Sequence, residues 1–251
     1  MLTANPFAPL VSFVSPDILQ GYLIVMALAV VVGTSYDLAH GKKATFFLQE
    51  RRRARAAARR ALGAGEAIRL AARTLLFDLA AFGEFCNRAK RIAHALMFYG
   101  FVLYVATTIA LVFGYPAERH PPLFLPLGWN IGAFMTLVGG YWFFFFLRVN
   151  VTHDGQSVWR LRRADLFLAS LLASVTFGVL LEWGEWDGNG VAIKVLAGAY
   201  EGLTALLFLT VAWSKFPHMF YKPVLAFGTK QDEANGASDL PPPAPGRGGG
   251  R

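Results

Sequence analysis

Five long apolar stretches constrain the fold of this chain more than any other feature of its sequence. They run from Ile18 to Tyr36, Ile92 to Phe113, Leu123 to Leu147, Leu166 to Trp183 and Val195 to Trp213. Each is close to the roughly 20 residues that a helix needs to cross a bilayer. None alternates polar and apolar residues with the period of two typical of membrane β-strands. Because a backbone in hydrocarbon must satisfy its own hydrogen bonds, the sequence predicts an all-α integral membrane bundle of five transmembrane helices.

The composition excludes two other classes of protein. Of the 251 residues, 55% are hydrophobic and 16% are charged, whereas about a quarter are charged in an ordinary soluble domain. The aromatic content of 14% excludes an intrinsically disordered chain. The single cysteine, Cys86, cannot close an intramolecular disulfide, hold an iron–sulfur cluster or attach a c-type haem. A redox centre carried by this chain alone therefore needs other ligands.

The distribution of basic residues predicts the orientation of the bundle. Of the 24 Lys and Arg residues, thirteen lie between Gly41 and Arg91, four in the connection between the third and fourth stretches, and five from Lys215 onward. Only Arg119 and Lys194 fall on the other side. Because loops rich in Lys and Arg stay in the cytoplasm, we expect the N-terminus outside and the C-terminus in the cytoplasm, across a bacterial-type inner membrane.

The segments around the apolar stretches divide the chain into three parts. Residues 1–17, with three prolines, are expected to form an extended external segment, and the first stretch lacks the basic flank and cleavage site of a signal peptide. Residues 18–225 are expected to form the membrane domain, with a basic cytoplasmic loop at 41–91. Residues 226–251 are expected to be a disordered cytoplasmic tail, because the sequence is rich in Pro and Gly from Asp232 onward.

The basic loop accounts for much of the net charge of +8. Such a charge is also found in nucleic-acid-binding proteins, but the positive-inside bias and attraction to anionic lipid explain it once five spans are present. We therefore expect membrane lipid and no nucleic acid as a partner. The Ala-rich run Arg51–Arg60 predicts a helix. From Ile68 to Phe82, apolar residues recur at helical spacing, which predicts an amphipathic helix on the inner membrane surface or against a partner.

Two histidines lie near the inner ends of predicted spans. His94 falls just inside the inner end of the second stretch, and His218 follows the fifth stretch, next to Pro217, which can bend a helix end. Two imidazoles at one depth on separate helices are what a six-coordinate b-type haem needs. Histidines are also ordinary at the membrane interface, where an ionisable group costs little, so their placement alone leaves both interpretations open.

The residues around these histidines resemble a known family. The second stretch contains Arg91-Ile92-Ala93-His94-Ala95-Leu96-Met97-Phe98-Tyr99-Gly100-Phe101, continuing to Thr107-Thr108, and the fifth is followed by Lys215-Phe216-Pro217-His218. Both segments resemble spans of respiratory cytochrome b membrane subunits, which include the gamma subunit of membrane nitrate reductase and the membrane subunits of heterodisulfide-reductase-like complexes. The resemblance extends in layout over roughly residues 15–225 and is specific only in these two segments. It implies that His94 and His218 are the axial ligands of a haem b iron.

The chain also departs from that family. Its dihaem members carry a second histidine pair nearer the outer face of the same two helices, whereas this chain has Tyr104 and Tyr200 in those regions and no histidine. The resemblance therefore implies one haem at most. Without a fused iron–sulfur domain, the chain looks most like the membrane anchor of a cytoplasmic sulfur-metabolising oxidoreductase, such as adenylylsulfate reductase. An anchor that has lost its haem is the alternative.

Polar residues at the inner face are candidates for quinone binding. Arg148, His153 and Lys215 lie there and are expected either to line a quinone head-group site or to contact lipid phosphates. A quinone needs donors for two carbonyl groups and a route for protons when it is reduced.

Other candidates lie in the outer part of the fifth stretch, where Tyr200 and Glu201 are part of Gly198-Ala199-Tyr200-Glu201-Gly202. This Gly-x-x-x-Gly motif favours close helix packing, and a proton relay or quinone contact through Tyr200 and Glu201 is the functional alternative. Glu182 and Glu185, at the outer end of the fourth stretch, either join that cluster or are solvated loop acids.

Together these features predict a membrane anchor and electron-transfer subunit that exchanges electrons between a cytoplasmic oxidoreductase and the quinone pool, with the substrate chemistry on a partner. The basic inner face suits an acidic flavin or iron–sulfur subunit. A haem-free, quinone-binding anchor is the second hypothesis. A small transporter is disfavoured because the spans hold few ionisable residues and no inverted repeat is evident.

Overall fold

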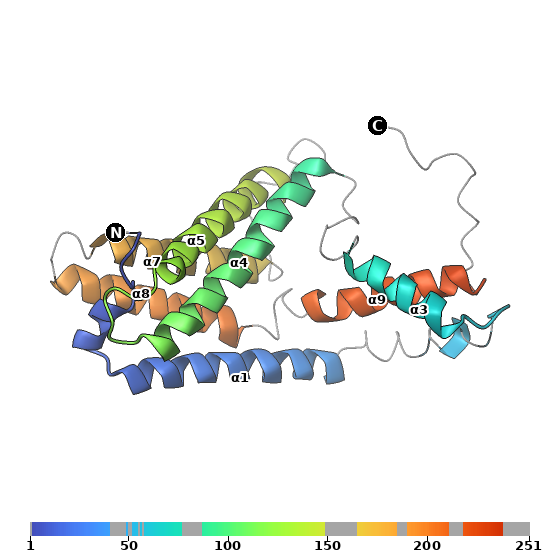
Figure 1. The fold of residues 1–251 in the computed structure, drawn as a ribbon, viewed down its shortest axis with the longest axis horizontal. Coiled ribbons are helices and arrows are strands. Elements are labelled where there is room, and N and C mark those ends of the chain that lie inside the picture. Colours follow the sequence, from blue (N-terminus) through green and yellow to red (C-terminus); the bar gives the residue numbers. More distant parts are fainter. Residues whose placement is uncertain are drawn as a thin grey trace. The chain divides into compact units, whose positions relative to one another are not determined.

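Helices make up every regular element in the described part of the chain. The computed structural model describes residues 2–40, 49, 52–54, 56, 58–76, 87–148, 165–184, 190–210 and 218–237. The chain forms two compact units (Figure 1). The first unit comprises Met1–Asp37 and Phe85–Pro217, and the second comprises Leu38–Glu84 and His218–Arg251.

Among the described residues, five helices are long and apolar enough to cross a membrane. They are α1 (Pro16–His40), α4 (Arg88–Gly114), α5 (Phe124–Trp142) with its π-helical continuation η3 (Phe143–Leu147), α7 (Leu166–Gly184) and α8 (Gly190–Leu209). The predicted all-α, five-span architecture is confirmed, and the chain is a multi-pass membrane protein. The fifth span begins at Gly190, ahead of the predicted Val195, and residues 211–213 of the prediction lie outside the described residues.

Local sequence explains where two of these helices begin. The Asn87 side chain caps α4, because its Oδ1 accepts hydrogen bonds from the backbone N–H groups of Ala89 at 2.9 Å and Lys90 at 3.3 Å. Helix α1 begins at Pro16, where a proline is well tolerated because the first turn has no use for its missing N–H. Tyr22 lies six residues after the start of α1, and His94 lies six residues after the start of α4.

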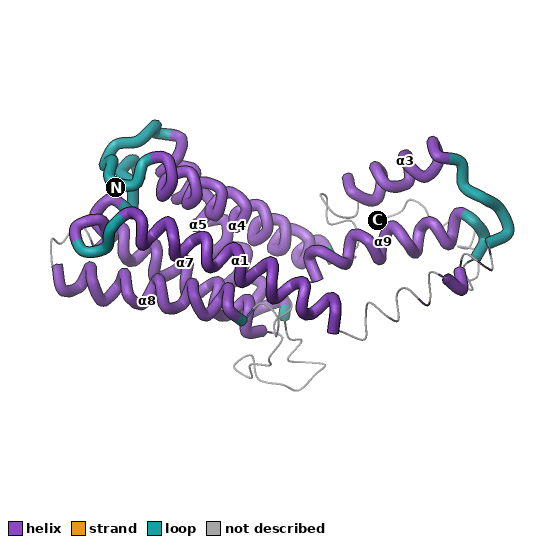
Figure 2. Tube along the Cα trace, turned by 90° about the horizontal axis from the view of Figure 1, so that it is seen from below, coloured by secondary structure: helices purple, strands orange, loops and turns teal. Residues whose placement is uncertain are grey.

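Helices α4 and α5 lie side by side and approach closely at glycines (Figure 2). A Cβ atom on Gly100 would lie 2.6 Å from the Thr136 backbone nitrogen, and one on Gly132 would lie 2.6 Å from the Tyr104 backbone nitrogen. At Gly139 a Cβ would lie 2.6 Å from the Ala93 carbonyl oxygen. Small residues allow such approach in membrane bundles, where dispersion contacts drive helix association.

The glycines of the predicted packing motif in the fifth span behave differently. Gly198 and Gly202 are exposed, and a Cβ on either would meet nothing within 4 Å. The close packing predicted for this motif is therefore not seen among the described residues, and packing of the motif against a partner chain stays a prediction. The face of α8 that packs inward instead contains Ala197, Tyr200, Thr204 and Leu207. A second Gly-x-x-x-Gly, Gly128 to Gly132 on α5, supplies the close approach to α4.

The N-terminal segment packs on the bundle instead of extending away from it. It forms the short 3-10 helix η1 (Ala8–Ser12), and Asn5 is only 1% exposed. The Asn5 Nδ2 donates to the carbonyl oxygens of Tyr115 at 2.8 Å and Glu118 at 3.1 Å, and its Oδ1 accepts from the Phe7 backbone N–H at 3.0 Å. The segment is thus bound to the α4–α5 connection, unlike the extended segment predicted for residues 1–17.

The second unit pairs α3 (Ala64–Arg73) with α9 (His218–Ala234). Helix α9 ends at Ala234, and Gly236 follows in the turn with a φ of 76°, in the left-handed region that glycine tolerates best. The predicted amphipathic helix is present as α3, which a further helical turn extends to residue 76, and residues 77–86 lie outside the described residues.

Two predictions for this unit differ from the structure. Residues 226–234 form the last turns of α9, where a disordered tail was expected, and residues 238–251 lie outside the described part. Within the predicted helix Arg51–Arg60, Arg59 and Arg60 form a bend. The backbone N–H of Arg59 donates to the Asn235 carbonyl at 3.0 Å, so contacts with the end of α9 replace helical hydrogen bonds there.

Candidate functional site

The His94 side chain lies in the second turn of α4 and is partly buried. Its ring packs edge-on against Phe143 of η3, with ring centroids 5.1 Å apart and planes inclined at 74°. The neighbouring Ala93 is fully buried against Gly139, so the rotation of α4 about its axis is fixed beside the imidazole. His94 is therefore held in position by close helix packing and by an aromatic ring.

Arg148 lies at the same end of the bundle, immediately after η3. Its backbone N–H donates to the Phe143 carbonyl at 2.8 Å, and its guanidinium carbon lies 4.5 Å from the centre of the Phe144 ring. The guanidinium forms an ion pair with Asp165, and the two side chains are 8% and 12% exposed. His94 and Arg148 thus contact adjacent rings of η3.

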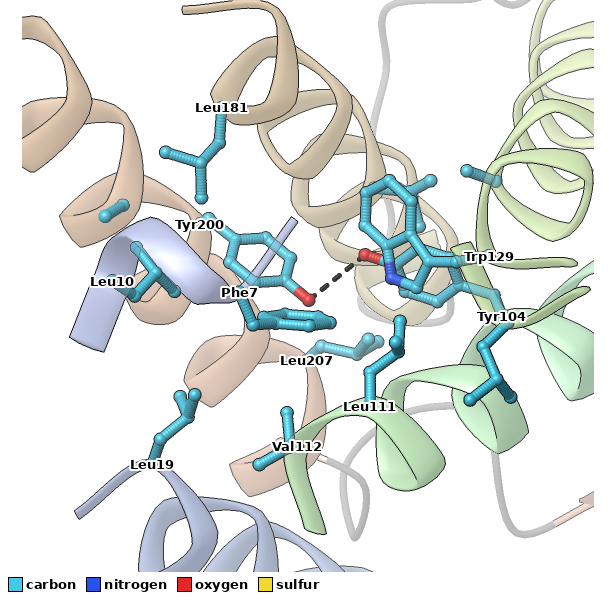
Figure 3. Packing of buried hydrophobic residues seen from close by; sticks show 14 of the residues in the cluster. Phe7, Leu10, Leu19, Tyr104, Leu111, Val112, Trp129, Leu181, Tyr200 and Leu207 are labelled. Carbon is cyan, nitrogen blue, oxygen red and sulfur yellow. Dashed lines mark hydrogen bonds between the residues drawn. The ribbon is translucent and has the colours of Figure 1, made fainter. Parts of the chain in front are cut away.

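A second group of polar side chains surrounds Tyr104 and Tyr200. The Tyr104 hydroxyl donates to the Tyr200 hydroxyl at 3.1 Å, and both side chains are buried (Figure 3). Trp129 lies 5.0 Å from the Tyr104 ring, and Phe7 of the N-terminal segment lies 6.1 Å from Trp129 and 6.5 Å from Tyr200, all between ring centroids. Segments far apart in the sequence therefore enclose the tyrosine pair.

Further hydrogen bonds in this region involve Trp129 and Asn130, which the sequence analysis did not single out. Trp129 Nε1 donates to Thr108 Oγ1 at 3.1 Å, and Asn130 Nδ2 donates to Glu182 Oε1 at 3.1 Å. Glu182 is 4% exposed, so it is a buried acid and not a solvated loop residue. Asn130 is a polar residue inside a largely apolar span, and this placement could have indicated from the sequence that it bonds to another buried polar side chain.

Glu201 also lies in this half of the bundle, and its side chain is partly buried. The Tyr22 hydroxyl of α1 donates to the Glu201 backbone carbonyl at 2.6 Å. This hydrogen bond joins α1 to α8 at the point where a proton relay was predicted. Glu185, the other acid of the predicted outer cluster, lies outside the described residues.

The predicted site residues thus fall into two separate groups. Tyr104 follows His94 by ten residues along α4, which corresponds to about 15 Å of helix. The group at one end contains His94 and Arg148, and the other contains Tyr200 and Glu201. His153 and Lys215 lie outside the described residues. His218 begins α9 in the second unit, its side chain is outside the described part, and its pairing with His94 stays a prediction.

No family model, curated protein or solved structure matches the chain. Among the described residues, no three or more His, Cys, Asp or Glu side chains are grouped to hold a metal ion. Any functional assignment therefore depends on the two groups of side chains and on the membrane-spanning architecture.

Proposed function

We propose that the chain is the membrane anchor and electron-transfer subunit of a quinone oxidoreductase in a bacterial-type inner membrane. Its partner is a cytoplasmic flavin or iron–sulfur protein of sulfur metabolism. Electrons pass between this partner and the quinone pool through one b-type haem. The substrate chemistry belongs to the partner. The basic loops give the membrane domain its orientation, with the N-terminus outside and the C-terminus in the cytoplasm.

The placement of His94 is the observation that carries this proposal. A partly buried imidazole lies inside the membrane-spanning helix α4, near the end that the basic residues assign to the cytoplasm. Its ring is held by Phe143 and its backbone by the Ala93–Gly139 contact. An axial haem ligand needs such a fixed orientation in an apolar surrounding, which also tunes the reduction potential.

The helix packing limits where a haem bound to His94 would lie. The interface of α4 with α5 is closed by contacts at Gly100, Gly132 and Gly139, so no porphyrin fits between these two helices. His94 shares a helical face with Phe101, seven residues on, and Phe101 contacts Phe167 of α7. We place the proposed haem on that face with His94 as one axial ligand, and His218 as the other ligand is what the sequence resemblance implies. The haem would supply one-electron transfer.

The proposal includes one haem and no second one. Tyr104 and Tyr200 occupy the region where dihaem relatives of the resembled family carry their other ligands. A Cβ on Gly178 would lie 3.0 Å from the Tyr104 hydroxyl oxygen and 3.1 Å from Tyr200 Cε2. Because side chains already fill this region, the packing supports one haem at most.

Arg148 is the described candidate for contact with a quinone. Its ion pair with Asp165 uses part of a guanidinium that has five N–H donors. We propose that a quinone carbonyl accepts a hydrogen bond from this guanidinium, with His153 and Lys215 as further candidates. Tyr200 and Glu201 lie too far along the bundle to belong to the same head-group site, and they serve as proton-relay candidates at the other end.

An absorption spectrum of the purified protein, oxidised and then reduced with dithionite, tests the proposal. We expect a b-type α-band and about one haem per chain. His94→Ala abolishes the low-spin spectrum, because the iron loses an axial ligand. His120→Ala is the matched control, since His120 is exposed in the α4–α5 connection, and it leaves the spectrum unchanged.

Two results would reject parts of this function. A folded but colourless preparation would reject the haem and favour the haem-free anchor, in which a partner's own cofactor reduces quinone at the membrane surface. An unchanged spectrum in His94→Ala would remove His94 from the ligand set. Identification of the soluble subunits that purify with the chain then tests the cytoplasmic oxidoreductase partner.

A further inference from the structure

An exposed apolar stripe runs along α3 and the helical turn that follows it. The stripe consists of Ile68, Ala72, Leu75 and Leu76, whose spacing places them on one side of a helix. Ile68 is 70% exposed, Leu75 is 52% exposed and Leu76 is 64% exposed. Within the described part of the chain these side chains therefore face solvent, although each is strongly apolar.

The remainder of α3 explains why the stripe is not part of the protein interior. Ala67, Leu70 and Ala71 are partly buried, and Thr74 is buried with its hydroxyl donating to the Leu70 carbonyl at 2.9 Å. These residues occupy a different side of the helix from the stripe, and α9 is the helix that α3 contacts. Helix α3 thus has one side packed within its unit and another apolar side exposed.

Two arginines border the stripe. Arg69 and Arg73 are both exposed and follow Ile68 and Ala72 by one residue, so they line the same edge of the stripe. The acid of the helix, Glu66, is on the far side of these arginines, and its carboxylate lies 3.4 Å from the Arg60 guanidinium. The edge of the stripe is therefore positively charged.

We propose that the apolar stripe of α3 inserts into the surface of an anionic lipid bilayer, with Arg69 and Arg73 at the lipid phosphates. Apolar residues with a bordering cationic edge are the pattern of helices that lie in the membrane plane. The charge is complementary to anionic lipid, which attracts basic segments close to spans. Helices α1 and α4 both have the length and hydropathy of spans, so the segment that joins them begins and ends at a membrane surface.

Spin-label accessibility in the full-length protein tests this proposal. The native cysteine is removed by Cys86→Ser, or by Cys86→Ala if the first variant does not fold. A single nitroxide is attached after Ile68→Cys or Leu75→Cys, and Glu66→Cys is the matched control on the same helix. The variants are placed in nanodiscs of phosphatidylcholine with phosphatidylglycerol, and collisions of the label with oxygen and with a water-soluble nickel chelate are measured.

Labels on the stripe should collide more with oxygen and less with the nickel chelate than the label at position 66, because oxygen concentrates in hydrocarbon. Equal nickel accessibility at all three positions would overturn the proposal. Protection of the stripe that appears only after a soluble subunit is added, or that grows with protein concentration in detergent, would assign the stripe to a protein partner or a second copy instead.

The arginines provide the second test. In phosphatidylglycerol nanodiscs, Arg69→Gln with Arg73→Gln should raise the nickel accessibility of the stripe labels, since each arginine shifts the balance between inserted and free helix by about fivefold. In nanodiscs of phosphatidylcholine alone the same double variant should have little effect. No change in the anionic nanodiscs would refute the role of the charges. Neither test needs haem, quinone or a partner, so both are independent of the function proposed above.

Discussion

Replacement of Gly132 by alanine tests whether glycines determine how closely α4 and α5 pack. The added Cβ would lie 2.6 Å from the Tyr104 backbone nitrogen, 2.8 Å from the Gly100 carbonyl oxygen and 3.0 Å from the Tyr104 Cα. All three atoms belong to the backbone of α4, so no side-chain rotation relieves the clash. The two helices must separate, and Tyr104 moves with its helix.

The expected destabilisation follows from the size of this clash. Ordinary van der Waals contact begins near 3.4 Å, so the shortest contact is too close by about 0.8 Å, on the repulsive side of the dispersion well. Overpacking of this kind costs about 1–3 kcal/mol. Alanine also favours the helix over glycine by about 0.5–1 kcal/mol, which offsets part of the cost. Gly132→Ala should therefore lower the free energy of unfolding by about 1–2 kcal/mol.

Gly198→Ala is the matched control, because the same substitution on α8 adds a Cβ that meets nothing within 4 Å. It gains the helix preference without the clash and should be neutral or slightly stabilising. The difference between the two variants isolates the packing cost, about 1–3 kcal/mol. It is measured by reversible unfolding in mixed micelles of increasing sodium dodecyl sulfate content, followed by far-ultraviolet circular dichroism. Equal free energies of unfolding for the two variants would refute the packing argument.

Substitutions at three further sites test the buried polar contacts. Asn5→Ala removes three hydrogen bonds that hold the N-terminal segment and should cost about 1–3 kcal/mol, seen as faster amide hydrogen exchange in that segment; unchanged exchange would contradict its role. Tyr104→Phe and Tyr200→Phe should each cost about 1 kcal/mol, and a double-mutant cycle with no coupling energy would rule out their hydroxyl contact. Arg148→Gln and Asp165→Asn each break a largely buried ion pair, at a cost of about 3 kcal/mol, and the double variant should be less destabilised than the two costs together.

The number and nature of the spans were predictable because each is encoded by its own local composition. A run of about 20 apolar residues specifies a helix in lipid whatever surrounds it. The faces that these helices turn toward one another were not predictable in the same way. Gly198 and Gly202 have the spacing of a packing motif. Such a motif indicates that another helix can pack closely at these glycines, but it does not identify that helix. Tyr200, beside Gly198, is buried because it faces Tyr104.

Long-range contacts limited the other predictions. The prolines of the N-terminal segment favour an extended chain locally, but Asn5 is bonded to carbonyl groups 110 and 113 residues away. Those acceptors exist only after α4 and its following loop have folded. The helix over residues 226–234 was missed because the Pro- and Gly-rich sequence beyond it dominated the composition of the tail, while its actual end is set by Gly236.

The distribution of buried polar groups bears on where cofactor chemistry belongs in this bundle. In the half around Tyr104, Phe7 and Trp129 enclose the hydroxyl pair, and Asn130 donates to the carboxylate of Glu182. A large planar group would have to displace these contacts and leave buried donors and acceptors without partners, which costs free energy for each group. The end that contains His94 instead presents an imidazole that packs edge-on against the Phe143 ring, and this arrangement supports the haem proposed there. We therefore assign the proposed electron transfer to the His94 end and proton movement to the Tyr104 half.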